Sequence, residues 1–319
     1  MAKHFTGAIA SVWLIAVLAS ASCGGDSEPA LPPTVRSTTA VVEARARPVR
    51  VKQLDLNSCN SEGQSDAPVI VIAHESNAER YIAPVKEALT RAVDQSRSVY
   101  DWASEKPIWV HMFASDDAFV QGLEQLGGLS PNPAEDYRQF FGTNGIDLAT
   151  GRDAVYMNTI VSRGPNWVPY VATHEYFHII QGHVGCSECL PTWFLEGMAD
   201  WEAIKLLGDP ETTWQSVLVT EQRAGRYPPL SALTTAEQWN AAQGVAWPYY
   251  KARGAIAYLE DLAGSRAVAD ILRDSAAGSF NFQFKFPEVT GIGLDQFEAG
   301  LLPFFERLAI RTTVPTPVP

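Results

Sequence analysis

Apolar residues in the first half of the chain gather in short runs that alternate with helical patterns. Residues 69–74 (VIVIAH) and 108–113 (IWVHMF) are rich in β-branched and aromatic side chains, which is typical of buried strands. Between them, apolar positions from about Pro84 to Trp102 recur at helical spacing, and Pro84 suits a first helical turn. The pattern therefore predicts a strand, a helix and a second strand in that order.

A further helix and strand follow. Residues 115–117 (SDD) predict a helix N-terminus, and this helix is expected to reach about Leu126. A loop rich in Gly, Pro and Asn follows at 127–133, and residues 154–159 (AVYMNT) predict a third strand. Because strands and helices alternate, we expect an α/β subdomain with a short mixed sheet over residues 51–165.

The second half of the chain has helical periodicity only. Helices are predicted at 166–182, from Pro191 to Gly208, and at 247–262, 267–276 and 294–308. The whole pattern predicts an α+β fold, in which the α/β subdomain is followed by a helical subdomain over residues 166–311. A tail rich in Pro and Thr, residues 312–319, is expected to be disordered.

The first helix of this second half carries an HExxH motif at residues 174–178 (HEYFH). Positions i and i+4 lie on one face of a helix, so His174 and His178 can both reach a single metal ion. Glu175 leans into the same open side, where it can take a proton from a metal-bound water. Zinc with three protein ligands and one open position is the usual arrangement for this chemistry. The motif alone can also arise by chance on an amphipathic helix whose histidines belong to the core.

A third ligand has two candidate sources. The extended pattern HExxHxxGxxH requires Gly at position 181 and His at position 184, but the chain has Gln181 and Val184, with His183 one residue out of register. A glutamate on the following helix is the other source. Glu196, which lies 18 residues after His178, provides one.

The segment WFLEGMADW around Glu196 makes the pattern specific. HExxH followed at this distance by W-x-x-E-G-x-A-[DE] resembles the gluzincin metallopeptidases of the MA clan. The resemblance implies that His174, His178 and Glu196 bind one Zn²⁺ per chain and that Glu175 is the general base. By the same match, Asp200 orients the first histidine through its other ring nitrogen.

The resemblance also implies a zincin-like fold. It covers about residues 51–310 in architecture and is specific only at 170–202. In such a fold the predicted strand at 154–159 is expected to be the sheet edge that pairs with an extended peptide.

A weaker match begins at Pro248. The gluzincin aminopeptidases carry a Pro-Tyr segment followed by a Tyr-Leu pair on the same helix, and this chain has Tyr249 after Pro248, then Tyr258 and Leu259. The resemblance implies that Tyr249 donates a hydrogen bond to the developing oxyanion. Tyr250 is the alternative donor, and packing roles for both tyrosines are the simplest alternative.

Composition and charge narrow the choice of function. The 319 residues are 46% hydrophobic and 10% aromatic, which is ample for a packed core. The net charge is −12 and no block rich in Lys and Arg is present, so the chain lacks the electrostatic features of nucleic-acid binding. His74 and His111 lie at or near the ends of predicted strands and are expected to be structural histidines.

The N-terminus has the pattern of an export signal. Lys3 and His4 precede an apolar run at residues 8–18, which is too short for an ordinary transmembrane helix. Small residues before Cys23, with two glycines after it, resemble a bacterial lipoprotein signal, although Ser20 stands where that motif usually has Leu.

We therefore expect a signal peptide at residues 1–22, lipidation of Cys23 and a disordered tether over 23–50. The protein would then be exported and anchored to the cell membrane. Plain secretion after cleavage is the alternative.

Three further cysteines are expected to lie in an oxidising compartment, where disulfides persist. Cys186 and Cys189 lie in the turn between the two metal-bearing helices. A bridge between them, or from Cys59 to either, would fix that turn. A second metal site formed by these cysteines with His183 is a further alternative.

The sequence as a whole predicts an exported, membrane-anchored zinc metallopeptidase that hydrolyses peptide or protein substrates. No exopeptidase anchoring motif is seen, which favours an endopeptidase. The alternatives are a non-catalytic surface or binding lipoprotein that keeps the helix pair as a scaffold, and an amidase acting on a non-peptide substrate.

Acylation of Cys23 predicts that the mature protein partitions into the detergent phase and that Cys23→Ala releases it to the aqueous phase. The physical reason is the apolar area of the attached acyl chains. Mass spectrometry of the mature N-terminus checks this expectation. An unmodified N-terminus at any other residue would contradict it.

Overall fold

The computed structural model describes residues 52–53 and 70–313, apart from 105, 139, 161–163, 165, 211–213 and 244–246. The predicted signal peptide, the tether with Cys23, Cys59 and the tail beyond residue 313 lie outside the described residues. None of the described helices is long and apolar enough to cross a bilayer.

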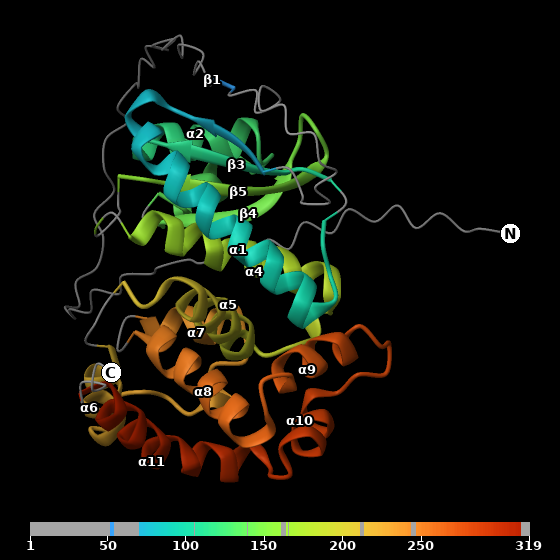
Figure 1. The fold of residues 1–319 in the computed structure, drawn as a ribbon, viewed down its shortest axis with the longest axis vertical. Helices are drawn as coiled ribbons and strands as arrows, with labels where there is room; N and C mark the ends of the chain where they lie inside the picture. Colours follow the sequence, from blue (N-terminus) through green and yellow to red (C-terminus); the bar gives the residue numbers. More distant parts are fainter. Residues whose placement is uncertain are drawn as a thin grey trace, which may run out of the picture.

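The first half of the described chain forms a mixed sheet (Figure 1). Its strands are β1 (Lys52–Gln53), β2 (Ile70–His74), β3 (Ile108–Phe113), β4 (Gly142–Asp147) and β5 (Arg152–Asn158). Their order is β1-β2-β3-β5-β4. The three central strands are parallel, and β1 and β4 pair antiparallel to them at the two edges.

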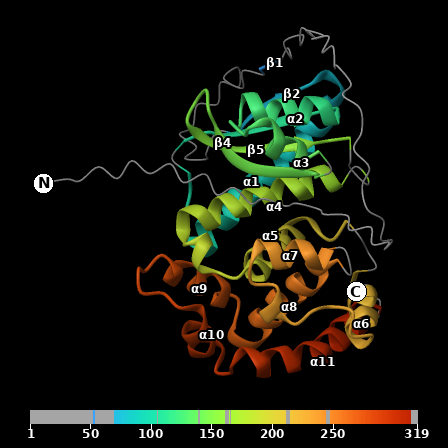
Figure 2. The same ribbon diagram turned by 180° about the vertical axis from the view of Figure 1, so that it is seen from behind.

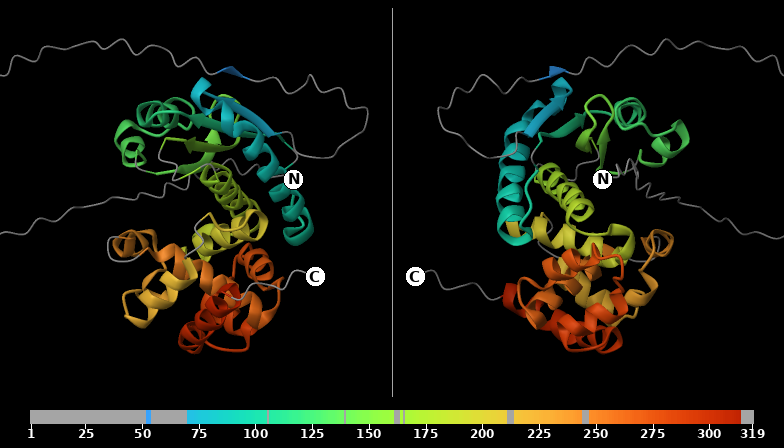
Figure 3. Two further views of the ribbon diagram at one scale, coloured as in Figure 1. Left: turned by 60° about the vertical axis from the view of Figure 1, so that its left-hand side comes forward. Right: turned by 90° about the vertical axis from the view of Figure 1, so that its right-hand side faces the viewer.

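Helices cover both faces of this sheet because its central strands alternate apolar side chains between two sides. The helices are α1 (Ile82–Tyr100), which follows the 3₁₀ segment η2 (Ser76–Tyr81), α2 (Asp116–Gln125), α3 (Pro131–Asp136) and α4 (Trp167–Val184). Val110 and Met112 pack toward α1 and α4, whereas Phe113 and Tyr156 pack toward α2. In Figure 3, α1 and the pair α2 and α3 accordingly lie on opposite sides of the sheet.

The second half is helical. Its elements are η3 (Ser187–Cys189), α5 (Thr192–Leu207), α6 (Trp214–Arg223), η4 (Leu230–Ala232), α7 (Ala236–Gln243), α8 (Pro248–Ala263), α9 (Ala267–Ser275), α10 (Phe282–Thr290) and α11 (Leu294–Thr313). In Figures 1 and 2, α4 lies between the sheet and this group of helices. The α+β class that the sequence predicts is confirmed.

Close packing of α5 against α8 follows from a glycine. A Cβ added to Gly197 would lie 2.5 Å from the carbonyl oxygen of Ala252, so only glycine permits this backbone approach. Pro191 precedes the first turn of α5, and Gly208, at φ 77°, ends the helix. The helix that carries Glu196 is therefore held against α8 at the residue beside that glutamate.

Several predicted elements match the structure closely. The strand expected at 108–113 is β3, and the helix expected after 115–117 is α2, whose Ser115 side chain accepts a hydrogen bond from the Ala118 amide. The helix expected at 294–308 is longer than predicted, since α11 ends at Thr313, inside the predicted tail.

The prediction that residues 154–159 form the sheet edge is wrong. This segment belongs to β5, which pairs with β3 on one side and with β4 on the other. The sequence of β4, GTNGID, has a single apolar side chain and no strand periodicity, so the pattern did not reveal it. Helices α6, α7 and α10 were likewise not predicted, and α3 begins inside the predicted loop at 127–133.

His74 and His111 have local partners in the structure. A ring nitrogen of His111 lies 2.9 Å from a carboxylate oxygen of Asp147, and both residues are buried. The Nδ1 of His74 donates to the carbonyl oxygen of Glu75 at 2.9 Å. Burial lowers the pKa of His111, although Asp147 opposes this shift. These contacts agree with the structural role expected for both histidines.

Candidate metal centre

Two buried helices bring the side chains of His174, His178 and Glu196 together. The Nε2 atoms of the histidines on α4 lie 3.0 Å apart. Oε2 of Glu196, on α5, lies 3.4 Å from Nε2 of His174 and 3.6 Å from Nε2 of His178. Two donors bound to one tetrahedral zinc at about 2.0–2.1 Å would lie about 3.3 Å apart. The three observed separations are close to that spacing, so the donors already surround one common point.

The electrostatics of this group favour a bound cation. Burial lowers the pKa of His174, but the carboxylates of Asp200 and Glu196 outweigh it and raise that pKa to about 10. Burial raises the pKa of Glu196, and the two histidines outweigh it, so that its pKa is lowered. In the described part of the chain, only His174, His178 and Glu196 form a group of three or more His, Cys, Asp or Glu side chains whose ligand atoms are close enough to hold one metal ion. Their donor set and charge fit a divalent metal ion.

Gln181 fixes the orientation of His178. Its Oε1 accepts a hydrogen bond from Nδ1 of His178 at 2.8 Å, and its Nε2 donates to the carbonyl oxygen of Leu195 at 2.8 Å. A histidine that donates from Nδ1 in its neutral form leaves Nε2 free to bind a metal. Gln181 also links α4 to the residue directly before Glu196. In the sequence this residue served only to exclude a third histidine ligand, and its own role was missed.

Asp200 lies behind His174, as the resemblance implies. Its Oδ1 is 3.7 Å from Nδ1 of His174, which is an ion-pair distance and too long for a direct hydrogen bond. The same oxygen accepts a hydrogen bond from the hydroxyl of Tyr170, one turn before His174 on α4. Burial raises the pKa of Asp200, but the charge of Arg253 and the contacts with His174 and Tyr170 lower it below its usual range. Asp200 therefore carries a negative charge toward His174.

Glu175 is 9% exposed and lies next to the first histidine on α4. Burial raises the pKa of its carboxyl, while the positive charges of His174 and His178 lower it in part. The charge of Glu175 in turn contributes to raising the pKa of Tyr137, after burial, to about 12. Tyr137 follows α3, so the sheet half of the molecule places a phenol near this carboxylate. Nothing in the local sequence of Tyr137 distinguishes it.

The two adjacent tyrosines at the start of α8 face different neighbours. The ring centroid of Tyr249 lies 6.0 Å from that of His174 and 4.9 Å from that of Trp239. Tyr250 instead lies beneath the guanidinium of Arg253, at 4.9 Å from its ring centroid. Burial, followed by the charges of nearby carboxylates that include Glu196, raises the pKa of Tyr249 well above its usual range. Tyr249 therefore keeps its proton and can act as a hydrogen-bond donor beside the candidate metal ligands.

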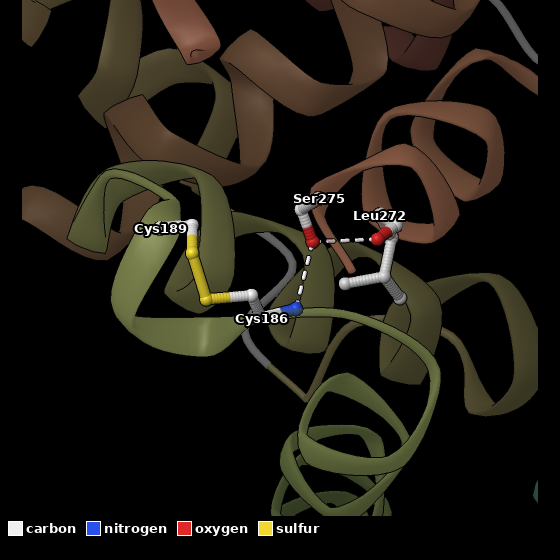
Figure 4. Close-up of a disulfide and its surroundings, with 4 residues drawn as sticks. All are labelled: Cys186, Cys189, Leu272 and Ser275. Atoms are coloured by element: carbon white, nitrogen blue, oxygen red, sulfur yellow. Dashed lines mark hydrogen bonds between the residues drawn. A yellow bond between two sulfur atoms is a disulfide. The ribbon is translucent and has the colours of Figure 1, made fainter. Parts of the chain in front are cut away.

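A disulfide joins Cys186 and Cys189 in the turn between α4 and α5 (Figure 4). The amide of Cys186 donates to Oγ of Ser275 at 2.8 Å, and that hydroxyl donates to the carbonyl oxygen of Leu272 at 2.6 Å. The turn is thus tied to α9. The sequence allowed a second metal site formed by these cysteines with His183. Instead, Nε2 of His183 lies 2.9 Å from Oδ2 of Asp153, and its ring stacks on Trp102.

Comparisons with known proteins show a distant structural likeness. No protein-family model matches the chain. No curated protein matches it either. A similar solved structure is the crystal structure of Legionella pneumophila aminopeptidase A in complex with aspartic acid, at 15% identity and a TM-score of 0.44. The match covers 73% of this chain and 26% of that chain, so this chain spans about a quarter of that protein's length.

Proposed function

We propose that this protein is a zinc-dependent peptidase of the gluzincin type. The observation that carries the proposal is the triangle formed by Nε2 of His174, Nε2 of His178 and Oε2 of Glu196, with edges of 3.0, 3.4 and 3.6 Å. A buried carboxylate, Glu175, stands beside it. Two imidazoles and one carboxylate are a donor set typical of catalytic zinc. When bound there, zinc would polarise a substrate carbonyl and make nearby water more acidic.

The protein's own groups supply the proton transfers. Glu175 takes a proton from the attacking water and later returns it to the leaving amine. Its burial keeps this carboxylate largely away from bulk water, and its raised pKa makes it a stronger base than an exposed glutamate. Tyr249 keeps its proton and donates a hydrogen bond to the oxygen on which negative charge develops.

An extended peptide is the substrate that fits the sheet edge. No described strand pairs with the outer edge of β4, which leaves backbone groups there for a further strand. A Cβ on Gly142, the first residue of β4, would approach a methyl group of Val171 on α4 to 3.0 Å, so this strand lies directly against the metal-bearing helix. A peptide that lies along an edge of this kind needs no free terminus, which favours endopeptidase action on peptide or protein substrates.

Export and membrane anchoring through Cys23 belong to the same proposal. The signal-like N-terminus supports them, and so does the disulfide between Cys186 and Cys189, because disulfides persist in oxidising compartments outside the cytosol. The zinc site would then act near the outer surface of the membrane.

The decisive variant for the peptidase proposal is Glu175→Gln. Glutamine cannot take the proton, so turnover should fall by about a hundredfold to ten-thousandfold, while the zinc content stays at the wild-type level. Digestion of casein or a peptide library, with and without a chelator, measures turnover, and elemental analysis measures zinc. Glu188→Gln, at an exposed position between the two metal-bearing helices, is the matched control and should behave as wild type. A zinc-loaded wild-type protein that cleaves no peptide, or loss of zinc from Glu175→Gln, would contradict the proposal.

The second prediction compares Tyr249→Phe with Tyr250→Phe. A phenol that acts on the oxyanion stabilises the transition state more than bound substrate. Tyr249→Phe should therefore lower kcat by about a hundredfold with little change in KM. Tyr250→Phe retains the ring beneath Arg253, so a small effect is expected. Steady-state kinetics on folded, zinc-loaded variants measure both.

A crippled Tyr250→Phe beside a near-wild-type Tyr249→Phe would reverse this assignment. Near-wild-type kcat in both variants would exclude both tyrosines as the donor. Tyr137, whose pKa responds to Glu175, would then be the next phenol to substitute.

A further inference from the structure

Arg253 on α8 is a buried cation that takes no part in the proposed proton transfers. It is only 3% exposed. Its Nε lies 2.6 Å from Oδ2 of Asp200, and its Nη1 donates to Oδ2 of Asp209 at 3.1 Å. One guanidinium therefore joins the carboxylate behind His174 to a carboxylate in the loop that follows α5. A lysine ammonium is a single point of charge and lacks the planar fork that reaches two such partners from fixed directions.

Two aromatic rings hold the guanidinium in place. Its central carbon lies 4.9 Å from the ring centroid of Tyr250 and 5.1 Å from that of Trp214, the first residue of α6. Contacts of this length are typical of cation–π pairs. With two carboxylates and two rings around it, the side chain of Arg253 has a single favourable position.

The position of α8 is fixed beside the metal ligands as well. Gly197 follows Glu196 directly and contacts the backbone of Ala252, the residue before Arg253. Tyr249 lies one turn before Arg253 and faces His174. The same stretch of α8 therefore places the Tyr249 ring near His174 and pairs Arg253 with Asp200, the carboxylate that faces His174.

The two oxygens of Asp200 have separate partners. Oδ1 accepts from the Tyr170 hydroxyl and faces Nδ1 of His174, whereas Oδ2 faces Arg253. Asp200 is 3% exposed, so it cannot turn toward bulk water if its cation is removed. An unpaired buried carboxylate is strongly unfavourable, and the surrounding side chains would rearrange to avoid it.

We propose that Arg253 is a positioning residue of the metal centre, which holds Asp200 in the orientation that aligns His174 and thereby sets the affinity for zinc. This inference rests on the proposed zinc site. The competing interpretation is that Arg253 only joins α5, α6 and α8 and contributes to folding.

Lys251 offers a matched control, because it is a second buried cation on the same helix. Its residue is 0% exposed, and its Nζ donates to the carbonyl oxygen of Pro228 at 2.7 Å and pairs with Glu298 on α11. Among the described residues, neither partner has a hydrogen bond or ion pair with His174, His178 or Glu196. Removal of either cation should destabilise the fold, but only Arg253 should affect the metal.

The experiment measures the zinc affinity of the purified metal-free protein by competition with a chromophoric chelator. We expect Arg253→Met to weaken zinc binding by about 10- to 100-fold, the range for loss of a group that orients a ligand. Lys251→Met should leave zinc affinity unchanged. Arg253→Lys keeps the charge but not the fork, so its affinity should fall between those of wild type and Arg253→Met. Thermal unfolding of each metal-free variant reports the loss of fold stability separately.

The outcomes separate this inference from the proposed function. If wild-type protein binds no zinc, the proposed metal site itself is wrong. If wild type binds zinc and Arg253→Met binds it equally well, or if Arg253→Met and Lys251→Met weaken binding equally, Arg253 does not position the site. Should Arg253→Met fail to fold, Arg253→Lys decides: wild-type zinc affinity in that variant overturns the proposal, and weakened affinity with Lys251→Met unchanged supports it.

Discussion

The packing of α5 between α4 and α8 is the constraint on which the candidate site depends. Glu196 has to reach two histidines on α4. Its Oε2 lies 3.4 Å from Nε2 of His174 and 3.6 Å from Nε2 of His178, so a shift of either helix would change the spacing of these donor atoms. Gln181 fixes the α4 side through the carbonyl oxygen of Leu195, and Gly197 admits the backbone of α8 on the other side. Both contacts flank Glu196 in the sequence. A small shift of α5 would therefore move Glu196 away from the two histidines and would also loosen the packing of α5 against α4 and α8.

Burial of charge is the second constraint. Glu175 and Asp200 are buried, and Glu196 beside them is partly buried. Carboxylates in such surroundings are stable only with cations near them. Arg253 supplies one positive charge within the protein. The remaining negative potential is what raises the pKa of His174, and a divalent ion would satisfy it better than protons on the histidines. The fold thus contains a site whose negative charge a bound cation would neutralise.

The sequence predicted those parts of the molecule that depend on local patterns. Strand β3, helix α2 and the positions of His174, His178 and Glu196 on two helices follow from periodicity, capping and spacing. Strand β4 could not be predicted, since its pairing depends on β5 and not on its own side chains. Arg253 was missed for a similar reason: its partners at Asp200 and Asp209 become neighbours only after α8 docks on α5. Long-range contacts of this kind leave no periodic signal in a single sequence.

The most direct test of the metal centre is diffraction from crystals of the purified protein, recorded on both sides of the zinc absorption edge. We expect one anomalous peak between the two histidines and the glutamate, about 2.0–2.2 Å from Nε2 of His174, Nε2 of His178 and Oε2 of Glu196. Zinc added to the crystals should raise the occupancy of that peak without moving it. The absence of a peak there in zinc-soaked crystals, or a peak held by other side chains, would contradict the central claim.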